Sequence, residues 1–291
     1  MKVPTSQFIG CDKPYSEAGT VLFGAPYDST TSFRPGTRFG PSAMRMDSFG
    51  IETYSPAQDK DLVDDTRVFD SGDLELPFGA PEPALKLIEE RAAEILADGK
   101  RPFLLGGEHL VTLGAFRAVQ KKYPDVVVIH FDAHADLRED YLGNPLSHAC
   151  VLRRIYDLVG DNRIYQFGIR SGTREEFAFM KAGRVTTEPF SDTTLADVVS
   201  TIEQSNNRTT PVYLTIDMDV LDPSEFPGTG TQEAGGFRYP QLVEDIRLIC
   251  SRLNVVAMDN VELNPGLDPT GRSTALACKF LRECLLALNS K

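Results

Sequence analysis

An apolar run followed at once by three possible metal ligands is the feature that most constrains how this chain can fold. The run is Val126-Val127-Val128-Ile129-His130-Phe131, and it leads directly into Asp132-Ala133-His134-Ala135-Asp136. Such a run is typical of a strand buried on both faces, as in a parallel sheet. Open α/β sheets bind their ligands at the carboxyl ends of the strands, which is where this segment begins. Two carboxylates and an imidazole this close together would repel and desolvate one another unless a cation compensated them, so the segment predicts a metal site.

Apolar strand candidates alternate with helical patterns along the chain. The runs that predict strands are Val21–Gly24, Val68–Asp70, Phe103–Leu105, Val126–Phe131, Ile164–Phe167, Val212–Ile216 and Val255–Met258. Helical spacing of apolar residues occurs between them, as in Ala84–Leu96 and Leu242–Leu253. This alternation favours a mostly parallel sheet covered by helices on both sides. The sequence contains no repeat, low-complexity tract or Pro/Ser-rich linker, so we expect one domain spanning residues 1–291.

Composition and charge exclude several classes of protein. The 291 residues are 41% hydrophobic and 25% charged, as in an ordinary globular protein. A net charge of −12 without a Lys/Arg stripe argues against nucleic-acid binding and slightly favours a cationic substrate. The five scattered cysteines suggest neither disulfides nor a thiolate zinc site, which fits the cytoplasm. Met1–Ser6 lacks the apolar core of a signal peptide, and no apolar run is long enough to span a membrane.

Four segments share one layout, an apolar run followed by polar groups suited to a metal or a substrate. They are Leu104–His109, Val126–Asp136, Leu214–Asp219 and Val256–Glu262. If the runs are neighbouring parallel strands, their polar groups converge at one edge of the sheet. Each segment alone has an ordinary explanation, because an Asp-x-Asp after a strand often caps the next helix, and His109 could also be a cap. Their joint occurrence is much harder to explain by capping.

The chemistry of the candidate ligands narrows the choice of metal. The candidates are imidazoles and carboxylates without a thiolate: His109, Asp132, His134, Asp136, Asp217 and Asp219. Nitrogen and oxygen ligands in this ratio suit Mn²⁺, with Zn²⁺, Fe²⁺ or Co²⁺ as alternatives. The four carboxylate charges would be balanced by two divalent ions. Two such ions can share a bridging water and lower its pKa toward about 7.

Several spaced motifs together resemble those of the ureohydrolase family, which includes arginase, agmatinase and formimidoylglutamase. The motifs are Gly106–His109, Asp132–Asp136, Asp217–Ser224 and Val261–Pro265, and the resemblance runs in order from Gly24–Asp28 to the C-terminal helix. It therefore covers nearly the whole chain, and it is greatest to agmatinase. It implies a three-layer α/β/α sandwich on a mainly parallel, eight-stranded sheet, as in arginases and deacetylases. It also implies two Mn²⁺ per chain and a homo-oligomer, either a trimer or a hexamer.

The resemblance also implies roles for individual residues. By the family pattern one ion is bound by His109 and Asp136, the other by His134 and Asp219, and both are bridged by Asp132 and Asp217. Glu262 lies where the family has a carboxylate that holds the substrate guanidinium. A carboxylate can pair with this planar group through both of its oxygens. The alternative explanation for Glu262 is an ordinary salt bridge at the surface. His148 matches the acid/base histidine of the family, although a histidine in the first turn of a helix is an alternative. Asp136 is a plausible proton acceptor.

The loop between Asp136 and His148 bears on the choice of substrate. Arginine would bring an α-carboxylate, and arginases have Ser, Thr and Asn in this loop to receive it. Here Glu139 and Asp140 would repel a carboxylate and attract an ammonium group, although Arg138 partly offsets them. Agmatine, which is decarboxylated arginine, therefore fits best, and we expect its hydrolysis to urea and putrescine. Guanidinobutyrate, arginine and other guanidino or formimino compounds are alternatives.

Two residues near the motifs and two rival functions complete the prediction. Glu108 stands where many family members have Asp, and we expect it to adjust the surroundings of the ligands without binding a metal. His130 is expected to make a hydrogen bond in the core or beside the ligands.

A dinuclear metallophosphoesterase would need an Asn-His pair, which this chain lacks. A non-catalytic relative acting as a binding protein is not supported, because the ligands, His148 and Glu262 are all present.

Overall fold

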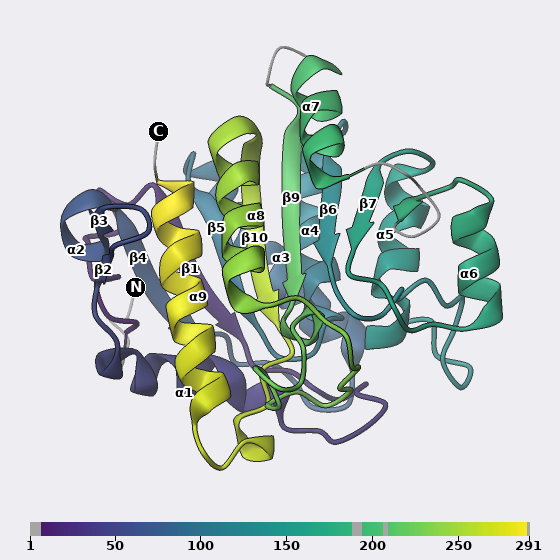
Figure 1. The fold of residues 1–291 in the computed structure, drawn as a ribbon, viewed down its shortest axis with the longest axis horizontal. Coiled ribbons are helices and arrows are strands. Elements are labelled where there is room, and N and C mark those ends of the chain that lie inside the picture. The colour runs from purple at the N-terminus through teal and green to yellow at the C-terminus, as the bar shows by residue number, and fades with distance from the viewer. Residues whose placement is uncertain (1–6, 188–193, 206–208, 290–291) are drawn as a thin grey trace.

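A parallel sheet of eight strands forms the centre of the protein (Figure 1). The computed structural model describes residues 7–187, 194–205 and 209–289. The N-terminal segment, in which we expect no signal peptide, lies outside these ranges. The strands are β1 (Thr20–Ala25), β4 (Val68–Asp73), β5 (Arg101–Gly106), β6 (Val127–Phe131), β7 (Ile164–Phe167), β8 (Thr186–Thr187), β9 (Pro211–Asp217) and β10 (Asn254–Val261). Their order is β4-β1-β5-β10-β9-β6-β7-β8, and each neighbouring pair is parallel.

Helices cover both faces of the sheet, which makes the predicted three-layer α/β/α sandwich. One face carries α3 (Pro81–Ala97), α4 (Val111–Lys122) and α5 (Val151–Val159), which lie behind the sheet in Figure 1. The other face carries α1 (Gly40–Asp47), α7 (Leu195–Ser205), α8 (Tyr239–Arg252) and α9 (Arg272–Leu288). The structure also contains a small antiparallel hairpin of β2 (Tyr54–Ser55) and β3 (Lys60–Asp61), the short helices α2 (Leu62–Asp65) and α6 (Arg174–Lys181), and several 3₁₀ turns, one of which, η3 (His148–Cys150), carries His148.

Each central strand supplies side chains to two separate cores, which explains why the strands appear as continuous apolar runs. In β6, Val127 and Ile129 pack in the core beneath α7, α8 and α9. Val128 packs in the core beneath α3, α4 and α5. Because side chains alternate along a strand, His130 lies on the same side of β6 as Val128.

The seven predicted strands are confirmed, and the structure adds an eighth. The edge strand β8 has two residues, too few to produce an apolar run. Both predicted helices exist, as α3 and α8. Within the described ranges, no helix is both long and apolar enough to cross a membrane.

The strand order determines where the polar segments meet. Strands β5, β10, β9 and β6 are consecutive neighbours in the sheet, although they are far apart in the sequence. Since all four are parallel, their carboxyl ends lie at the same edge. The four segments with polar ends therefore converge there, as the sequence predicts.

Candidate metal centre

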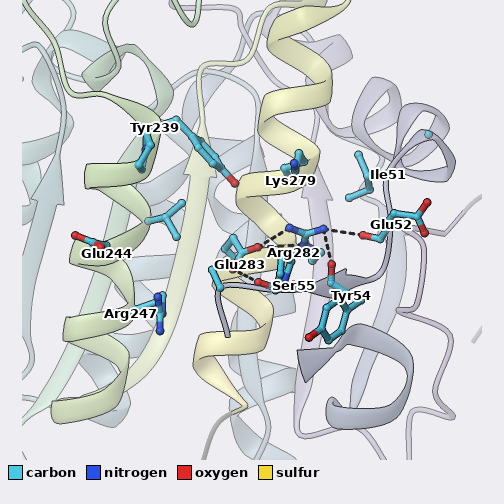
Figure 2. A pocket seen from close by; sticks show the side chains of 15 residues that line it. Ile51, Glu52, Tyr54, Ser55, Tyr239, Glu244, Arg247, Lys279, Arg282 and Glu283 are labelled. Atoms are coloured by element: carbon cyan, nitrogen blue, oxygen red, sulfur yellow. Dashed lines mark hydrogen bonds and ion pairs between the residues drawn. The ribbon is translucent and has the colours of Figure 1, made fainter. Parts of the chain in front are cut away.

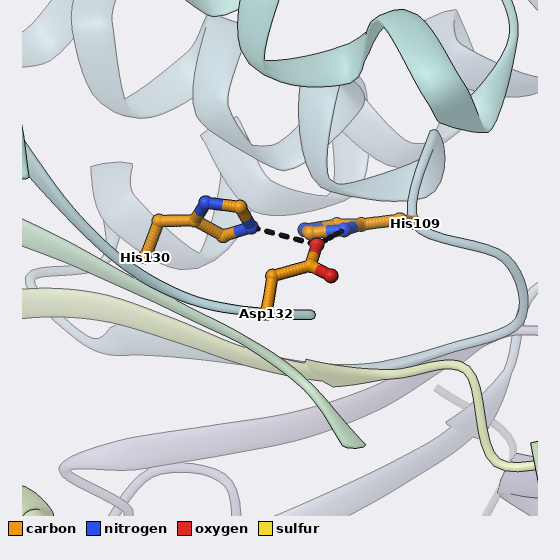
Figure 3. Close-up of side chains that lie close together, drawn as sticks. All are labelled: His109, His130 and Asp132. Atoms are coloured by element: carbon orange, nitrogen blue, oxygen red, sulfur yellow. Dashed lines mark hydrogen bonds and ion pairs between the residues drawn. The ribbon is translucent and has the colours of Figure 1, made fainter. Parts of the chain in front are cut away.

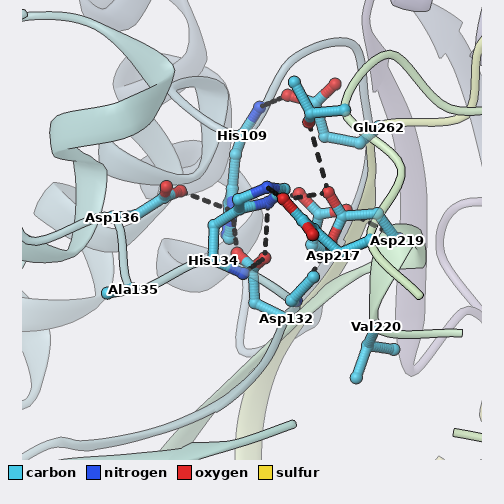
Figure 4. A network of polar contacts seen from close by, with 12 residues as sticks. His109, Asp132, His134, Ala135, Asp136, Asp217, Asp219, Val220 and Glu262 are labelled. Carbon is cyan, nitrogen blue, oxygen red and sulfur yellow. Dashed lines mark hydrogen bonds and ion pairs between the residues drawn. The ribbon is translucent and has the colours of Figure 1, made fainter. Parts of the chain in front are cut away.

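The six predicted ligands come together at the carboxyl edge of the sheet (Figure 4). His109 lies in the turn between β5 and α4, and Asp217 ends β9. The segment after β6 supplies Asp132, His134 and Asp136, while Asp219 lies in the 3₁₀ turn η4 (Met218–Val220). All are buried except His134, which is partly exposed.

His109 is the centre of one half of the cluster. Its Nδ1 lies 3.0 Å from Asp132 Oδ2, 3.2 Å from Asp136 Oδ2 and 3.4 Å from Asp217 Oδ2. Its Nε2 lies 3.0 Å from the hydroxyl of Thr215, which donates its only hydrogen to Asp259.

The hydroxyl oxygen of Thr215 must therefore accept a hydrogen bond from His109 Nε2. That leaves the lone pair of Nδ1 facing three carboxylates, and this buried nitrogen has no hydrogen-bond partner among the described residues. A cation between the nitrogen and these carboxylates would satisfy all of them.

His134 is the centre of the other half. Its Nδ1 lies 3.0 Å from Asp219 Oδ2 and 3.5 Å from Asp132 Oδ1. The two oxygens of Asp132 thus face different imidazoles, as a carboxylate that bridges two ions requires. Asp217 contacts His109 directly, and its Oδ1 accepts a hydrogen bond from the backbone N–H of Asp219 at 2.8 Å.

The electrostatics of the cluster show that it carries more negative charge than it can stabilise alone. Burial and the charges of Asp219 and Asp132 raise the pKa of Asp217 well above its usual range. Burial and Asp132 likewise raise the pKa of Asp136 to about 6. Burial disfavours the charged form of His109, but the nearby carboxylates of Asp132, Asp136 and Asp217 outweigh this and raise its pKa well above the usual value. A buried set of two imidazoles and four carboxylates that attracts positive charge fits two divalent cations.

Glu262 and His148 form a pair beside this cluster. Glu262 follows β10, is buried, and accepts a hydrogen bond from the backbone N–H of His109 at 2.8 Å. Its own N–H donates to the carbonyl of Gly107 at 2.9 Å. His148 Nδ1 lies 3.3 Å from Glu262 Oε1, and although burial opposes it, the carboxylate raises the pKa of His148 to about 9.

Two of the functional candidates have a strained backbone. Asp136 has a φ of 53° and Glu262 a φ of 66°, in the left-handed region that non-glycine residues rarely occupy. Strain of this kind costs on the order of 1–3 kcal/mol and persists where the surrounding structure enforces it. In both residues it aims a carboxylate at the cluster.

Glu108 does not face the ligand cluster but holds the loop that contacts His148. Its carboxylate accepts hydrogen bonds from the N–H of Thr30 and the hydroxyl of Thr31, each at 2.9 Å, and from the hydroxyl of Thr30. The Thr30 hydroxyl in turn accepts from the backbone N–H of His148 at 3.2 Å. The N–H of Ser32 donates to His148 Nε2 at 3.0 Å. Glu108 therefore acts on His148 through this loop.

A cavity of about 220 Å³ opens onto the cluster, and its lining was predicted only in part. His134, Asp136, His148 and Asp217 line it as expected, together with Ser32, Arg138, Tyr141, Glu176 and Thr231. Glu176 is not evident from the sequence as a cavity residue, because it lies three residues after Thr173, at the spacing of an ordinary helix capping box, which it also forms.

Glu139 and Asp140 do not line this cavity. They line a neighbouring one of about 280 Å³. The Glu139 side chain is 79% exposed and lies 3.5 Å from Arg153, and Asp140 accepts a hydrogen bond from the N–H of Gly143. Their assignment to substrate binding stays a prediction.

A larger cavity of about 800 Å³ lies away from the cluster, between α8, α9 and the segment containing β2 (Figure 2). Its centre is the buried Arg282, which pairs with Glu283 and donates to the carbonyls of Glu52 and Tyr54. Ser55 donates to the other oxygen of Glu283. Because these contacts occupy the guanidinium and the carboxylate, we interpret them as fastening the hairpin to α9.

Replacing Asp217 should empty the metal centre. In Asp217→Asn a neutral amide replaces a buried carboxylate that lies beside both halves of the cluster, so we expect metal binding and hydrolysis to be lost together. Metal analysis of the purified protein, with urea release measured on the same sample, checks this. The surface variant Asp157→Asn, with the same change of charge, should behave like the unmodified protein. Two bound ions with full turnover in Asp217→Asn would contradict the site.

Comparison with known proteins agrees with this geometry. The model of the arginase family matches residues 18–287. The chain is 47% identical to an agmatinase from Halalkalibacterium halodurans, over 96% of this chain and 95% of that protein. It is 35% identical to a guanidinobutyrase from Pseudomonas aeruginosa, over 92% of this chain and 86% of that protein.

A solved structure is also similar to this chain. A putative agmatinase from Clostridium difficile superimposes with a TM-score of 0.90 and is 48% identical, covering 95% of this chain and 99% of that one. The family match, these identities and the converging ligands together establish that the chain belongs to the arginase family.

Proposed function

We propose that this protein is a binuclear manganese hydrolase that cleaves the guanidino group of agmatine to urea and putrescine, within a single domain spanning residues 1–291. The observation that carries the proposal is the buried cluster of two imidazoles and four carboxylates beside Glu262. The 47% identity to an agmatinase supports this choice of reaction.

The residues that would hold the two ions follow the halves of the cluster. One ion would be held by His109 and Asp136, the other by His134 and Asp219, and both by Asp132 and Asp217. The all-nitrogen-and-oxygen donor set suits Mn²⁺. When bound, the two ions would supply a water of lowered pKa as the nucleophile, together with positive charge that stabilises the tetrahedral intermediate.

The side chains of the protein orient the substrate and move its protons. The carboxylate of Glu262 would accept two parallel hydrogen bonds from the guanidinium and so fix its carbon beside the cluster. The carboxylate of Asp136 would accept the proton that the attacking water loses. His148, whose Nε2 accepts from the N–H of Ser32, would give the proton on Nδ1, which faces Glu262, to the leaving amine as the C–N bond breaks.

The far end of the substrate would lie toward the loop after Asp136. We propose that Glu139 and Asp140, from the neighbouring cavity, attract the ammonium group, and that the buried carboxylate of Glu176 adds negative charge on the wall of the cavity at the cluster. Arg138 also lines the cavity and favours a second candidate substrate, guanidinobutyrate, which ends in a carboxylate. Its guanidinium is partly occupied, because it lies 3.6 Å from Glu176 and stacks on the ring of Tyr141.

The proposal extends to the cellular setting of the enzyme. We propose that it works in the cytoplasm, in polyamine biosynthesis, and as a homo-oligomer, either a trimer or a hexamer. The five cysteines support a reducing compartment, because all are buried and none is in a disulfide. We propose a small cationic guanidino compound as its partner, with no nucleic acid or membrane.

A urea-release screen tests the proposed reaction. The manganese-loaded protein is assayed with agmatine, guanidinobutyrate and arginine at equal concentrations, and we expect the highest kcat/KM with agmatine. A preference for guanidinobutyrate would instead indicate that Arg138 binds the carboxylate of the substrate. No urea from any guanidino compound, with two ions bound, would contradict the proposal.

Glu262→Gln should separate substrate orientation from metal binding. The amide oxygen can still accept from the N–H of His109, so both ions should stay bound. The loss of one charged hydrogen-bond acceptor, worth about 1.5–3 kcal/mol, should lower kcat/KM by roughly ten- to a hundredfold. Metal analysis beside steady-state kinetics checks this, and near-normal kinetics would remove Glu262 from the mechanism.

The acidic loop should act on agmatine through long-range charge. We expect the double variant Glu139→Gln/Asp140→Asn to raise the KM for agmatine by about two- to thirtyfold at low ionic strength, with kcat unchanged, because exposed charges contribute about 0.2–1 kcal/mol each. The effect should disappear at high salt. Glu90→Gln on α3 is the control and should leave the KM unchanged. An equal change at both salt concentrations would point to a local contact.

A further inference from the structure

His130 is a buried titratable group that the proposed reaction does not use. It lies in β6, and its Nε2 is 2.9 Å from Asp132 Oδ2 (Figure 3). The two side chains share one side of the strand because they are two residues apart. His109 Nδ1 approaches the same oxygen to 3.0 Å, so Asp132 Oδ2 lies between two imidazoles.

Gln166 on the neighbouring strand determines which nitrogen of His130 carries the proton. It stands opposite His130 in the register of β6 and β7, with its Nε2 3.1 Å from His130 Nδ1 and 2.9 Å from the carbonyl oxygen of Ala135. A carbonyl can only accept, so the amide nitrogen is the atom that faces both groups and donates to them. Thr187 in β8 donates to the remaining Gln166 Oε1 at 3.1 Å, which agrees with this orientation.

His130 is consequently a hydrogen-bond donor and not a metal ligand. Its Nδ1 accepts from Gln166, so its proton is on Nε2 and is donated to Asp132. His109, His130 and Asp132 are close enough to hold an ion between them, but His130 has no lone pair free to face it.

The two oxygens of Asp132 are held by different groups. Oδ1 accepts from the backbone N–H of His134 at 2.6 Å and faces the His134 half of the centre. Oδ2 accepts from His130 and faces the His109 half. Loss of the His130 side chain would therefore release Oδ2 while the backbone of His134 still held Oδ1.

We propose that His130 is a positioning residue for one of the two ions: together with Gln166 it orients Asp132 Oδ2 toward the ion at His109 and so sets the affinity of that ion. The inference rests on the proposed two-ion centre. Removing a hydrogen-bond partner of a metal ligand lowers metal affinity by about 10- to 100-fold. We expect a loss of this size at the His109 ion alone.

Metal binding without substrate tests the inference on the full chain. His130→Phe removes the donor and keeps a ring of similar size, whereas His130→Gln keeps an amide donor near the position of Nε2. Thr187→Val is the matched control, because it changes the far end of the network and leaves both hydrogen bonds donated by Gln166. Equilibrium dialysis against Mn²⁺, with metal analysis, gives the number of ions and their dissociation constants.

The expected result is selective. The unmodified protein and Thr187→Val should bind two ions, while His130→Phe should bind one ion normally and the other about 10- to 100-fold more weakly. His130→Gln should recover part of that loss. Unchanged binding of both ions in His130→Phe, or equal weakening of both, would overturn the inference.

A second variant and a spectroscopic measurement cover the case in which His130→Phe fails to fold. Gln166→Leu removes the donor to Nδ1 and should weaken the same ion. With four histidines in the chain, nitrogen NMR of the zinc-loaded protein can resolve each ring, and His130 should be protonated at Nε2 only. Protonation at Nδ1 would overturn the inference. Two ions bound normally by the unmodified protein without urea from agmatine would instead contradict the proposed function and leave this inference intact.

Discussion

Buried negative charge at the carboxyl edge of the sheet is the constraint on which the rest of the structure depends. Four aspartates of the cluster are buried within contact of two imidazoles, where carboxylates that lack compensation would be unstable. Around them, neighbouring groups fix the direction of each ligand. Thr215 and Asp259 determine which nitrogen of His109 carries the proton. His130, oriented by Gln166, donates a hydrogen bond to Asp132. Burial and neighbouring carboxylates raise the pKa of Asp217, and neighbouring carboxylates raise that of His109, so without cations the cluster would hold protons instead.

The turn between β5 and α4 links the metal centre to the groups that would handle the substrate. Gly107 accepts from the N–H of Glu262, and His109 donates to its carboxylate. Glu108, between them, holds the loop that contacts His148. Three consecutive residues thus position His109, Glu262 and His148, which we propose as a metal ligand, the carboxylate for the guanidinium and the acid/base group. Their spacing depends on close packing at Gly107, where a Cβ atom would overlap the backbone of Tyr27.

Most of the fold and of the ligand set could be predicted from the sequence because both leave local patterns. Apolar runs marked the strands buried on two faces, and the ligands follow those runs directly. The edge strand β8 left no such pattern, because its two residues, Thr186 and Thr187, are too few to show one. The role of Glu108 could not be predicted either, since its partners Thr30 and Thr31 are nearly eighty residues away and are brought to it only by the pairing of β1 with β5.

The wall of the cavity was the hardest part to predict. Glu176 has the spacing of a helix cap, and it is a cap, so its second position beside the cluster depends on how α6 is placed against the loop after β6. Glu139 and Asp140 carry the charge expected of an ammonium site but lie in the neighbouring cavity. Charge can be read from a sequence, whereas the direction of a loop side chain depends on contacts such as that between Glu139 and Arg153.

The Gly107–His109 turn has a consequence for how such an enzyme can diversify. The groups proposed to act on the C–N bond are held at the strand ends, by this turn and by the loop that contacts His148. The cavity wall is formed in part by Arg138 and Tyr141, on the loop between Asp136 and His148, and by Glu176 in α6. Substitution of the Arg138 or Tyr141 side chain would change this wall without removing a group of the proposed reaction. The same reactive groups can therefore serve guanidino substrates that differ beyond the guanidinium. New specificities can then evolve by substitution of the residues that line the cavity.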